Sequence, residues 1–215
     1  AVWAVAGGRL GAKLLYLFTR LPELIADPAQ IVNCLKDGFV VYGSIIGGVL
    51  AAWVYCKRHG MVFLELFDLV APYLALAQGI GRIGCVLAGC CYGMEVSADT
   101  PFAIVFHESA YAPNNVPLFP TQALSSILNF IHFAVLMLLS KRLKTNGQVA
   151  GCYLIFYSIG RFILEYFRGD LIRGNVGTFS TSQFISMFIV IAGLFMVFLL
   201  PKLQKRQETS APSQE

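Results

Sequence analysis

Two arginines stand inside long apolar stretches of the sequence. Arg82 lies in the run QGIGRIGC (78–85), and Arg161 lies in the run YSIGRFILEYFR (157–168). A charge near the middle of a bilayer costs at least about 2.5–3.5 kcal/mol on insertion scales, so each arginine needs a reason to be there. A guanidinium is permanently charged, and its planar fork of donors matches phosphate oxygens. The two arginines therefore predict a site for an anionic phospholipid head group.

Three polar residues share the predicted helix face of Arg161. Tyr157 precedes Arg161 by four residues, Glu165 follows it by four and Arg168 follows Glu165 by three, so these residues form one stripe that must face protein or water. A purely structural alternative is that Arg161 pairs with Glu165 and that Arg82 extends to the membrane interface. The placement of the charges alone leaves both interpretations open.

Two more polar side chains are expected at the outer level of the membrane. Tyr42 begins one predicted span, and Gln122 begins another after Pro120 and Thr121. Gln122 can hydrogen-bond a polar head group, and Tyr42 is a candidate proton acceptor. Each also has a structural interpretation, Tyr42 as an interfacial aromatic residue and Gln122 as a helix-start residue.

Cys85 and the adjacent pair Cys90 and Cys91 are the most unusual local feature. Buried thiols usually behave as small hydrophobes, whereas a cation such as Arg82 nearby lowers a thiol pKa and favours reactivity. A zinc site would need four ligands, such as these three thiols with His107, and the repeated paired spacing typical of such sites is absent. We expect no metal and no cofactor.

Composition places these residues in a membrane protein. The chain has 215 residues, of which 57% are hydrophobic and only 13% are charged, and its mean hydropathy is +0.67. A soluble domain carries about 25% charged residues, so this class is excluded. The net charge of +4 does not imply nucleic acid, because most basic residues flank apolar runs.

A bilayer core requires about 20 apolar residues as helix. Six stretches approach this length: Val2–Phe18, Gly38–Cys56, Leu66–Ala88, Thr121–Ser140, Gln148–Phe167 and Ser182–Leu200. The first is weaker because it contains Arg9 and Lys13. We therefore predict an all-α, polytopic transmembrane helix bundle over residues 1–200, followed by a basic, polar and disordered cytoplasmic tail over 201–215. His132, inside one span, is expected to serve core packing.

Lysines and arginines orient the predicted spans. Basic clusters follow the second, fourth and sixth stretches, at 57–58, 141–144 and 202–206, which places those ends in the cytoplasm. No lysine or arginine occurs between Arg82 and Lys141, so the loop over 93–120 is expected outside. Arg82 and Arg161 then approach the outer leaflet from two different helices.

The motifs together resemble the prolipoprotein diacylglyceryl transferase family. The similarity runs in order and spacing along nearly the whole chain. It is carried by GGRLG (7–11), DGFVVYGSIIGG (37–48), GRIG (81–84) with the segment to Gly93, FPTQ (119–122) and the stripe 157–168.

The resemblance implies a seven-helix enzyme of the bacterial inner membrane with its first helix absent from this chain. Its substrates would be phosphatidylglycerol and prolipoprotein signal peptides with a lipobox cysteine. A diacylglyceryl group would pass to the cysteine thiol as a thioether, with release of glycerol phosphate. This is the first step of lipoprotein maturation.

The resemblance also assigns roles to individual residues. Arg82 matches the signature arginine that binds the lipid head group, and Arg161 matches the essential arginine of the penultimate helix. Gln122 matches a family glutamine, and Tyr157, Glu165 and Arg168 match the family's polar stripe.

The chain departs from the family signature in its polar half. Cys85 and Ala88 stand where the signature has asparagines, and Cys90 stands where it has a glutamate. Tyr42 stands where many members have histidine, so Tyr42 or a Cys90 thiolate is left as the candidate base. Two alternatives follow: a non-catalytic lipid-binding relative, and a thiol-dependent membrane oxidoreductase using Cys85, Cys90 and Cys91.

Overall fold

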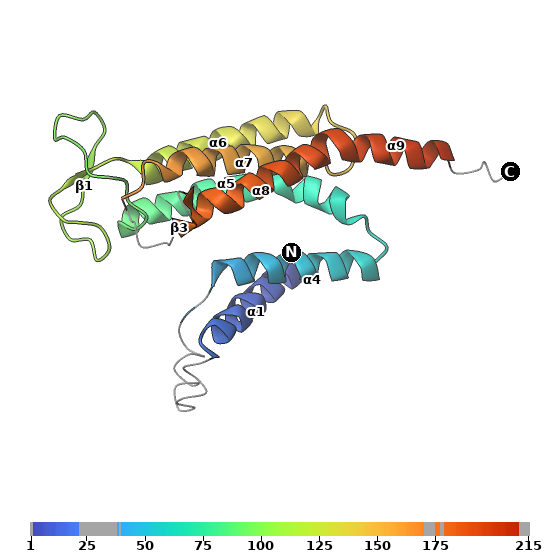
Figure 1. The fold of residues 1–215 in the computed structure, drawn as a ribbon, viewed down its shortest axis with the longest axis horizontal. Coiled ribbons are helices and arrows are strands. Elements are labelled where there is room, and N and C mark those ends of the chain that lie inside the picture. Colours follow the sequence, from blue (N-terminus) through green and yellow to red (C-terminus); the bar gives the residue numbers. More distant parts are fainter. Residues whose placement is uncertain (1, 22–37, 39, 170–174, 177–178, 211–215) are drawn as a thin grey trace. The chain divides into compact units, whose positions relative to one another are not determined.

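The computed structural model describes residues 2–21, 38, 40–169, 175–176 and 179–210. Most of these residues are helical, and the chain divides into two compact units, Ala1–Leu66 and Phe67–Glu215 (Figure 1). Each unit is built by helices that pack along their lengths.

Two glycine-rich helices form the first unit. Helix α1 (Val2–Thr19) packs on helix α4 (Val41–Arg58). A Cβ added at Gly11 would overlap the carbonyl oxygen of Gly43, and one added at Gly47 would overlap that of Gly7. The two backbones therefore touch directly, as small residues spaced by four allow in membrane helix pairs.

Four helical segments make the second unit. These are α5 (Phe63–Ala88), whose first turn belongs to the end of the first unit, α6 (Thr121–Ser140), α7 (Gln148–Glu165) and α8 (Thr181–Leu194). Helix α8 continues through a π-helical turn, η2 (Phe195–Leu199), into α9 (Leu200–Ser210). Helix α7 packs between α6 and α8 (Figure 1). The Ser126 hydroxyl of α6 donates to the Gly79 carbonyl of α5 at 2.8 Å.

The hydrophobic core of this unit is built from α5, α6 and α7. Small residues of α5 meet larger ones of α6 and α7; the buried members are Ala71, Ala75, Leu136, Val149, Ala150 and Tyr153. The Asp68 carboxylate of α5 caps this end of α7, where it accepts the Gly147 N–H at 2.6 Å and the Ala150 N–H at 2.7 Å. A carboxylate from one helix thus satisfies the unpaired donors at the start of another.

The segment between α5 and α6 carries short strands. Strand β1 (Ile104–Val105) pairs antiparallel with β2 (Pro117–Leu118), with Ile104 opposite Leu118. A second small pair, β3 (Asn175–Val176) with β4 (Phe179–Ser180), precedes α8. Ser180 and Gln183 then form a capping box at the start of α8.

The helices fall on the stretches predicted from hydropathy. Among the described residues, three helical segments are long and apolar enough to cross a membrane: Phe63–Ala88, Thr121–Ser140 and Thr181–Lys205. The other three predicted stretches correspond to α1, α4 and α7, which are helices of 18 residues with a more polar composition. The helical, membrane-type fold is confirmed, and the count of six spans stays a prediction.

Residues 201–210 of the predicted disordered tail continue the last helix as part of α9. Leucine, lysine, glutamine, arginine and glutamate favour helix, and a preceding helix removes the cost of nucleation. Residues 211–215 lie outside the described part of the chain, as does Asp37 of the DGFVVYGSIIGG motif.

Candidate lipid-phosphate site

A tight turn ends α5 and begins the site. The Gly89 N–H donates to the Val86 carbonyl and the Cys90 N–H donates to the Cys85 carbonyl, each at 3.2 Å, which is the pattern of a Schellman motif. Gly89 has a φ of 67°, in the left-handed region, and a Cβ there would overlap the Ser109 hydroxyl. Only glycine meets both conditions, and the turn brings Cys90 back beside Cys85.

Side chains at the start of α6 hold this turn in place. The Gln122 amide N–H donates to the Cys90 carbonyl at 3.1 Å, and the Thr121 hydroxyl donates to the Cys91 carbonyl at 3.3 Å. Gln122 is 2% exposed. Gln122 therefore holds the backbone of the cysteine turn through a buried hydrogen bond.

The end of α7 is joined to the same region by the backbone. The Met94 N–H donates to the Phe167 carbonyl at 2.9 Å, and the Gly169 N–H donates to the Tyr92 carbonyl at 3.2 Å. The rings of Phe119 and Phe167 stack with centroids 5.0 Å apart. These contacts fix Arg168, between Phe167 and Gly169, next to the turn after α5.

A cavity of about 590 Å³ opens between α5, α6 and α7. Arg82, Arg161 and Arg168 all line it, and no aspartate or glutamate is among the described residues that line it. Other lining side chains are Gln78, Cys85, Cys91, Thr121, Ser125, Leu128, Asn129, His132, Phe156 and Tyr157. A cavity with several guanidinium groups and an apolar wall suits a molecule with an anionic head and hydrocarbon chains.

Arg161 is held by two partners. Its Nη2 lies 2.9 Å from Glu165 Oε2, and the same atom donates to the Ser182 hydroxyl at 3.0 Å. The two charged side chains are only 14% and 9% exposed, so their geometry is shielded from solvent. The ion pair predicted as a structural alternative is present, and Arg161 also lines the cavity.

Arg82 is placed differently. Among the residues that the structure describes, it makes no hydrogen bond or ion pair. The cavity therefore contains one guanidinium fixed by a carboxylate and another whose donors are available to a ligand. Arg82, Arg161 and Arg168 bring three guanidinium groups to the cavity, and Glu165 pairs with Arg161.

The structure brings most of the predicted residues together. Arg82, Cys85, Tyr157, Arg161 and Arg168 line one cavity.

Three predicted residues are not among the cavity's lining residues: Gln122, Glu165 and Cys90. Gln122 hydrogen-bonds the Cys90 carbonyl, and Glu165 pairs with the lining residue Arg161. Tyr42 belongs to the first unit, on the first turn of α4, with its side chain 48% exposed.

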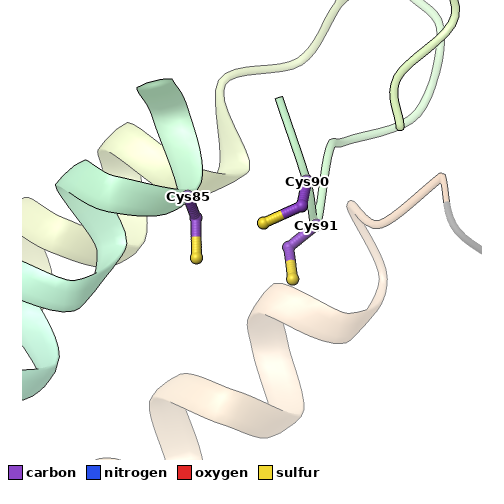
Figure 2. Close-up of side chains that lie close together, drawn as sticks. All are labelled: Cys85, Cys90 and Cys91. Atoms are coloured by element: carbon purple, nitrogen blue, oxygen red, sulfur yellow. The ribbon is translucent and has the colours of Figure 1, made fainter. Parts of the chain in front are cut away.

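The three cysteines of the turn form a cluster. Figure 2 shows the side chains of Cys85, Cys90 and Cys91 gathered where α5 ends, and their sulfur atoms all lie within 4.8 Å of one another. None of the three forms a disulfide with another described residue. Burial, together with the neighbouring Cys85 and Cys91 thiols, raises the pKa of Cys90 to about 11, so Cys90 is protonated at neutral pH.

Two residues of the site were missed from sequence. Ser182 supplies the second acceptor for Arg161, and the signal for it was a hydroxyl at the start of the apolar stretch that follows the arginine helix. His132 was expected in the core, where it does stack on Tyr153 with centroids 5.3 Å apart, and it also lines the cavity. Its spacing along α6 from Ser125 and Asn129 marks the same helix face.

Comparison with known proteins identifies relatives over most of the chain. The family model for prolipoprotein diacylglyceryl transferase matches residues 1–199. A phosphatidylglycerol–prolipoprotein diacylglyceryl transferase of Clostridium tetani is 45% identical over 206 residues, covering 96% of this chain and 81% of the relative. A second such transferase, from Clostridium perfringens, is 46% identical over 97% of this chain and 80% of its own length. The transferase of Pseudomonas aeruginosa is 34% identical over 91% of this chain and 73% of its own.

Proposed function

Since the chain belongs to the prolipoprotein diacylglyceryl transferase family, we propose that it moves the diacylglyceryl group of phosphatidylglycerol to a prolipoprotein cysteine. The acceptor is the lipobox cysteine thiol, and the product is a thioether. The reaction is the first step of bacterial lipoprotein maturation.

The arginine-lined cavity is the observation that carries this function. Arg82, with no described protein partner, is the group proposed to bind the phosphate of phosphatidylglycerol. Its five donors in a fixed fork suit two phosphate oxygens at once. The apolar residues Leu128 and Phe156 line the same cavity and suit the hydrocarbon part of the lipid.

The reaction needs charge stabilisation at the leaving group. The cysteine sulfur attacks the diacylglyceryl carbon, a C–S bond forms, and the bond from that carbon to the phosphate oxygen breaks. Glycerol phosphate leaves with one more negative charge, and the thiol proton passes to an acceptor. Arg161, fixed by Glu165 and Ser182, is pre-organised to stabilise that developing charge.

Two residues are candidates for the proton acceptor. Burial raises the pKa of Cys90 to about 11, which argues against a resident Cys90 thiolate at neutral pH. Tyr42→Phe and Cys90→Ala test this assignment separately. Full activity in both variants would remove both residues from the mechanism.

We place the enzyme in the bacterial cytoplasmic membrane with its active site toward the outer leaflet. The loop over 93–120 has acidic residues and no lysine or arginine, whereas basic clusters follow α4 and α6. Reporter fusions at Asn114 and at Thr145 test the orientation. A periplasmic alkaline phosphatase should be active at the first position and inactive at the second.

The decisive experiment is complementation of cells depleted of their own transferase. Lipoprotein modification is read by mass spectrometry for the wild type, Arg82→Ala, Arg161→Ala and Arg142→Ala. Arg142 is an exposed arginine just after α6 and serves as the matched control. A diacylglyceryl adduct in the wild type and the control, and its loss in the other two variants, is the expected result.

Two outcomes would contradict the proposal. No adduct from well-expressed wild-type protein that still binds phosphatidylglycerol would indicate a non-catalytic lipid-binding relative. A diacylglyceryl adduct that persists in Arg82→Ala would show that the lipid phosphate does not require Arg82.

A further inference from the structure

The cysteine cluster is a preformed set of soft donors. The Schellman turn at Gly89 brings Cys90 and Cys91 beside Cys85, and Gln122 and Thr121 hold the backbone of the two later cysteines. The three sulfur atoms lie within 4.8 Å of one another and are only partly exposed (Figure 2). The positions come from the fold, so a bound ion would not have to order this segment.

The donor set is purely sulfur. Within the described part of the chain, no histidine nitrogen or carboxylate oxygen joins this group of potential ligands. Closed structural zinc sites are four-coordinate, whereas soft thiolate donors also select monovalent copper. Three sulfurs without a fourth donor suit a cation that is satisfied by three ligands.

We propose that Cys85, Cys90 and Cys91 bind one monovalent copper ion through their three sulfur atoms. Each thiol releases its proton to solvent as its sulfur binds the metal. Three thiolates and one monovalent cation leave the complex with a charge of −2. No electron is transferred in this step.

Because of the position of the cluster, bound copper can affect the transferase reaction. This part of the proposal rests on the proposed function. Cys85 and Cys91 line the same cavity as Arg82, Arg161 and Arg168. An anionic copper–thiolate complex there neutralises guanidinium charge that the lipid phosphate needs. Copper occupancy therefore inhibits diacylglyceryl transfer by competing with the phospholipid.

The binding test uses the full chain, purified in detergent and reduced without oxygen. Monovalent copper is delivered from a copper-specific chelator of known affinity, and bound copper is counted and analysed by X-ray absorption. We expect one copper per chain with three sulfur neighbours. Each single alanine variant of the cluster should show two sulfur neighbours and weaker binding, and the triple variant should bind none.

Cys152→Ala is the matched control, because Cys152 is a free cysteine on α7 outside the cluster. It should retain three sulfur neighbours. Fewer than three sulfurs in the wild type, or copper uptake by the triple variant equal to the wild type, would overturn the site. These readouts require no transferase activity, so they stand apart from any failure of the proposed function.

A second arm tests the link to catalysis. Transfer is measured with and without one equivalent of copper in the wild type, Cys152→Ala and Cys91→Ala, each relative to its own copper-free rate. Inhibition in the first two, with less in Cys91→Ala and relief by more phosphatidylglycerol, is expected. An unchanged wild-type rate at full occupancy would overturn the inhibitory role.

Discussion

At the residue scale, the site depends on how each charged side chain is fixed. Glu165 and Ser182 hold Arg161, whereas Arg82 has no hydrogen bond or ion pair among the described residues. The sequence could identify both arginines, because a charge in an apolar run is costly. It could not assign their partners, because the Ser182 contact comes from a helix 21 residues away.

Glu165→Gln should reduce turnover more than it changes lipid affinity. The substitution removes the charge from the partner at 2.9 Å, so Arg161 is oriented less firmly while the cavity becomes more positive. Small displacements of a catalytic group can slow a reaction by about 100-fold. Steady-state kinetics with phosphatidylglycerol should show a fall in kcat with KM unchanged or lower. A rise in KM at constant kcat would instead make Glu165 a determinant of lipid binding.

The Cys90 thiol should become more reactive when its neighbours are removed. Burial raises the pKa of Cys90 to about 11, and hydrogen bonds and charge interactions with Cys85 and Cys91 contribute to the rise. In the double variant Cys85→Ala, Cys91→Ala the pKa falls, so the thiolate fraction at pH 8 increases. Alkylation of Cys90 at pH 8, followed by mass spectrometry, should be faster than in the wild type. An equal rate would show that the neighbouring thiols do not act on it.

At the element scale, helix ends and glycine contacts decide the packing. Hydropathy located the helices, but it did not reveal that Asp68 of α5 caps α7, because the two segments are 79 residues apart. The glycines of α1 and α4 were recognised as a motif without their contact being predicted. Which helix faces meet depends on tertiary packing, and one sequence does not specify it.

Asp68→Ala should destabilise the second unit by about 1.5–3 kcal/mol, the range for hydrogen bonds to a charged group. Both carboxylate oxygens accept backbone N–H groups at the start of α7, and alanine leaves those donors unpaired. Thermal unfolding in detergent should show a lower Tm for Asp68→Ala than for the wild type. Asp99→Ala, at an exposed position in the loop, is the control and should leave the Tm unchanged.

Gly47→Ala should weaken the pairing of α1 with α4, whereas Gly48→Ala should be tolerated. A Cβ at Gly47 overlaps the Gly7 carbonyl oxygen, but a Cβ at Gly48 meets its nearest atom at 3.4 Å, an ordinary contact. Expression level and Tm of the two variants provide the comparison. Equal behaviour of the two would contradict the direct backbone contact described for this helix pair.

At the scale of the whole molecule, the sequence accounts for the membrane class and the family. Apolar stretches predicted the helices, and the motif order predicted the transferase family that the relatives establish. The clustering of Cys85, Cys90 and Cys91 was not predictable from spacing alone. It depends on a left-handed glycine and on two side chains of α6, which only the folded chain brings together.

The glycines around the cavity also bear on how the enzyme can respond to selection by an inhibitor. Gly81 lines the cavity, and a Cβ added there meets no atom within 4 Å. Gly89 has neither the space nor the backbone geometry for a side chain. Substitution of Gly81 by a larger residue can therefore give resistance to a compound that fills the cavity. Substitution of Gly89 cannot, because a side chain there is not tolerated.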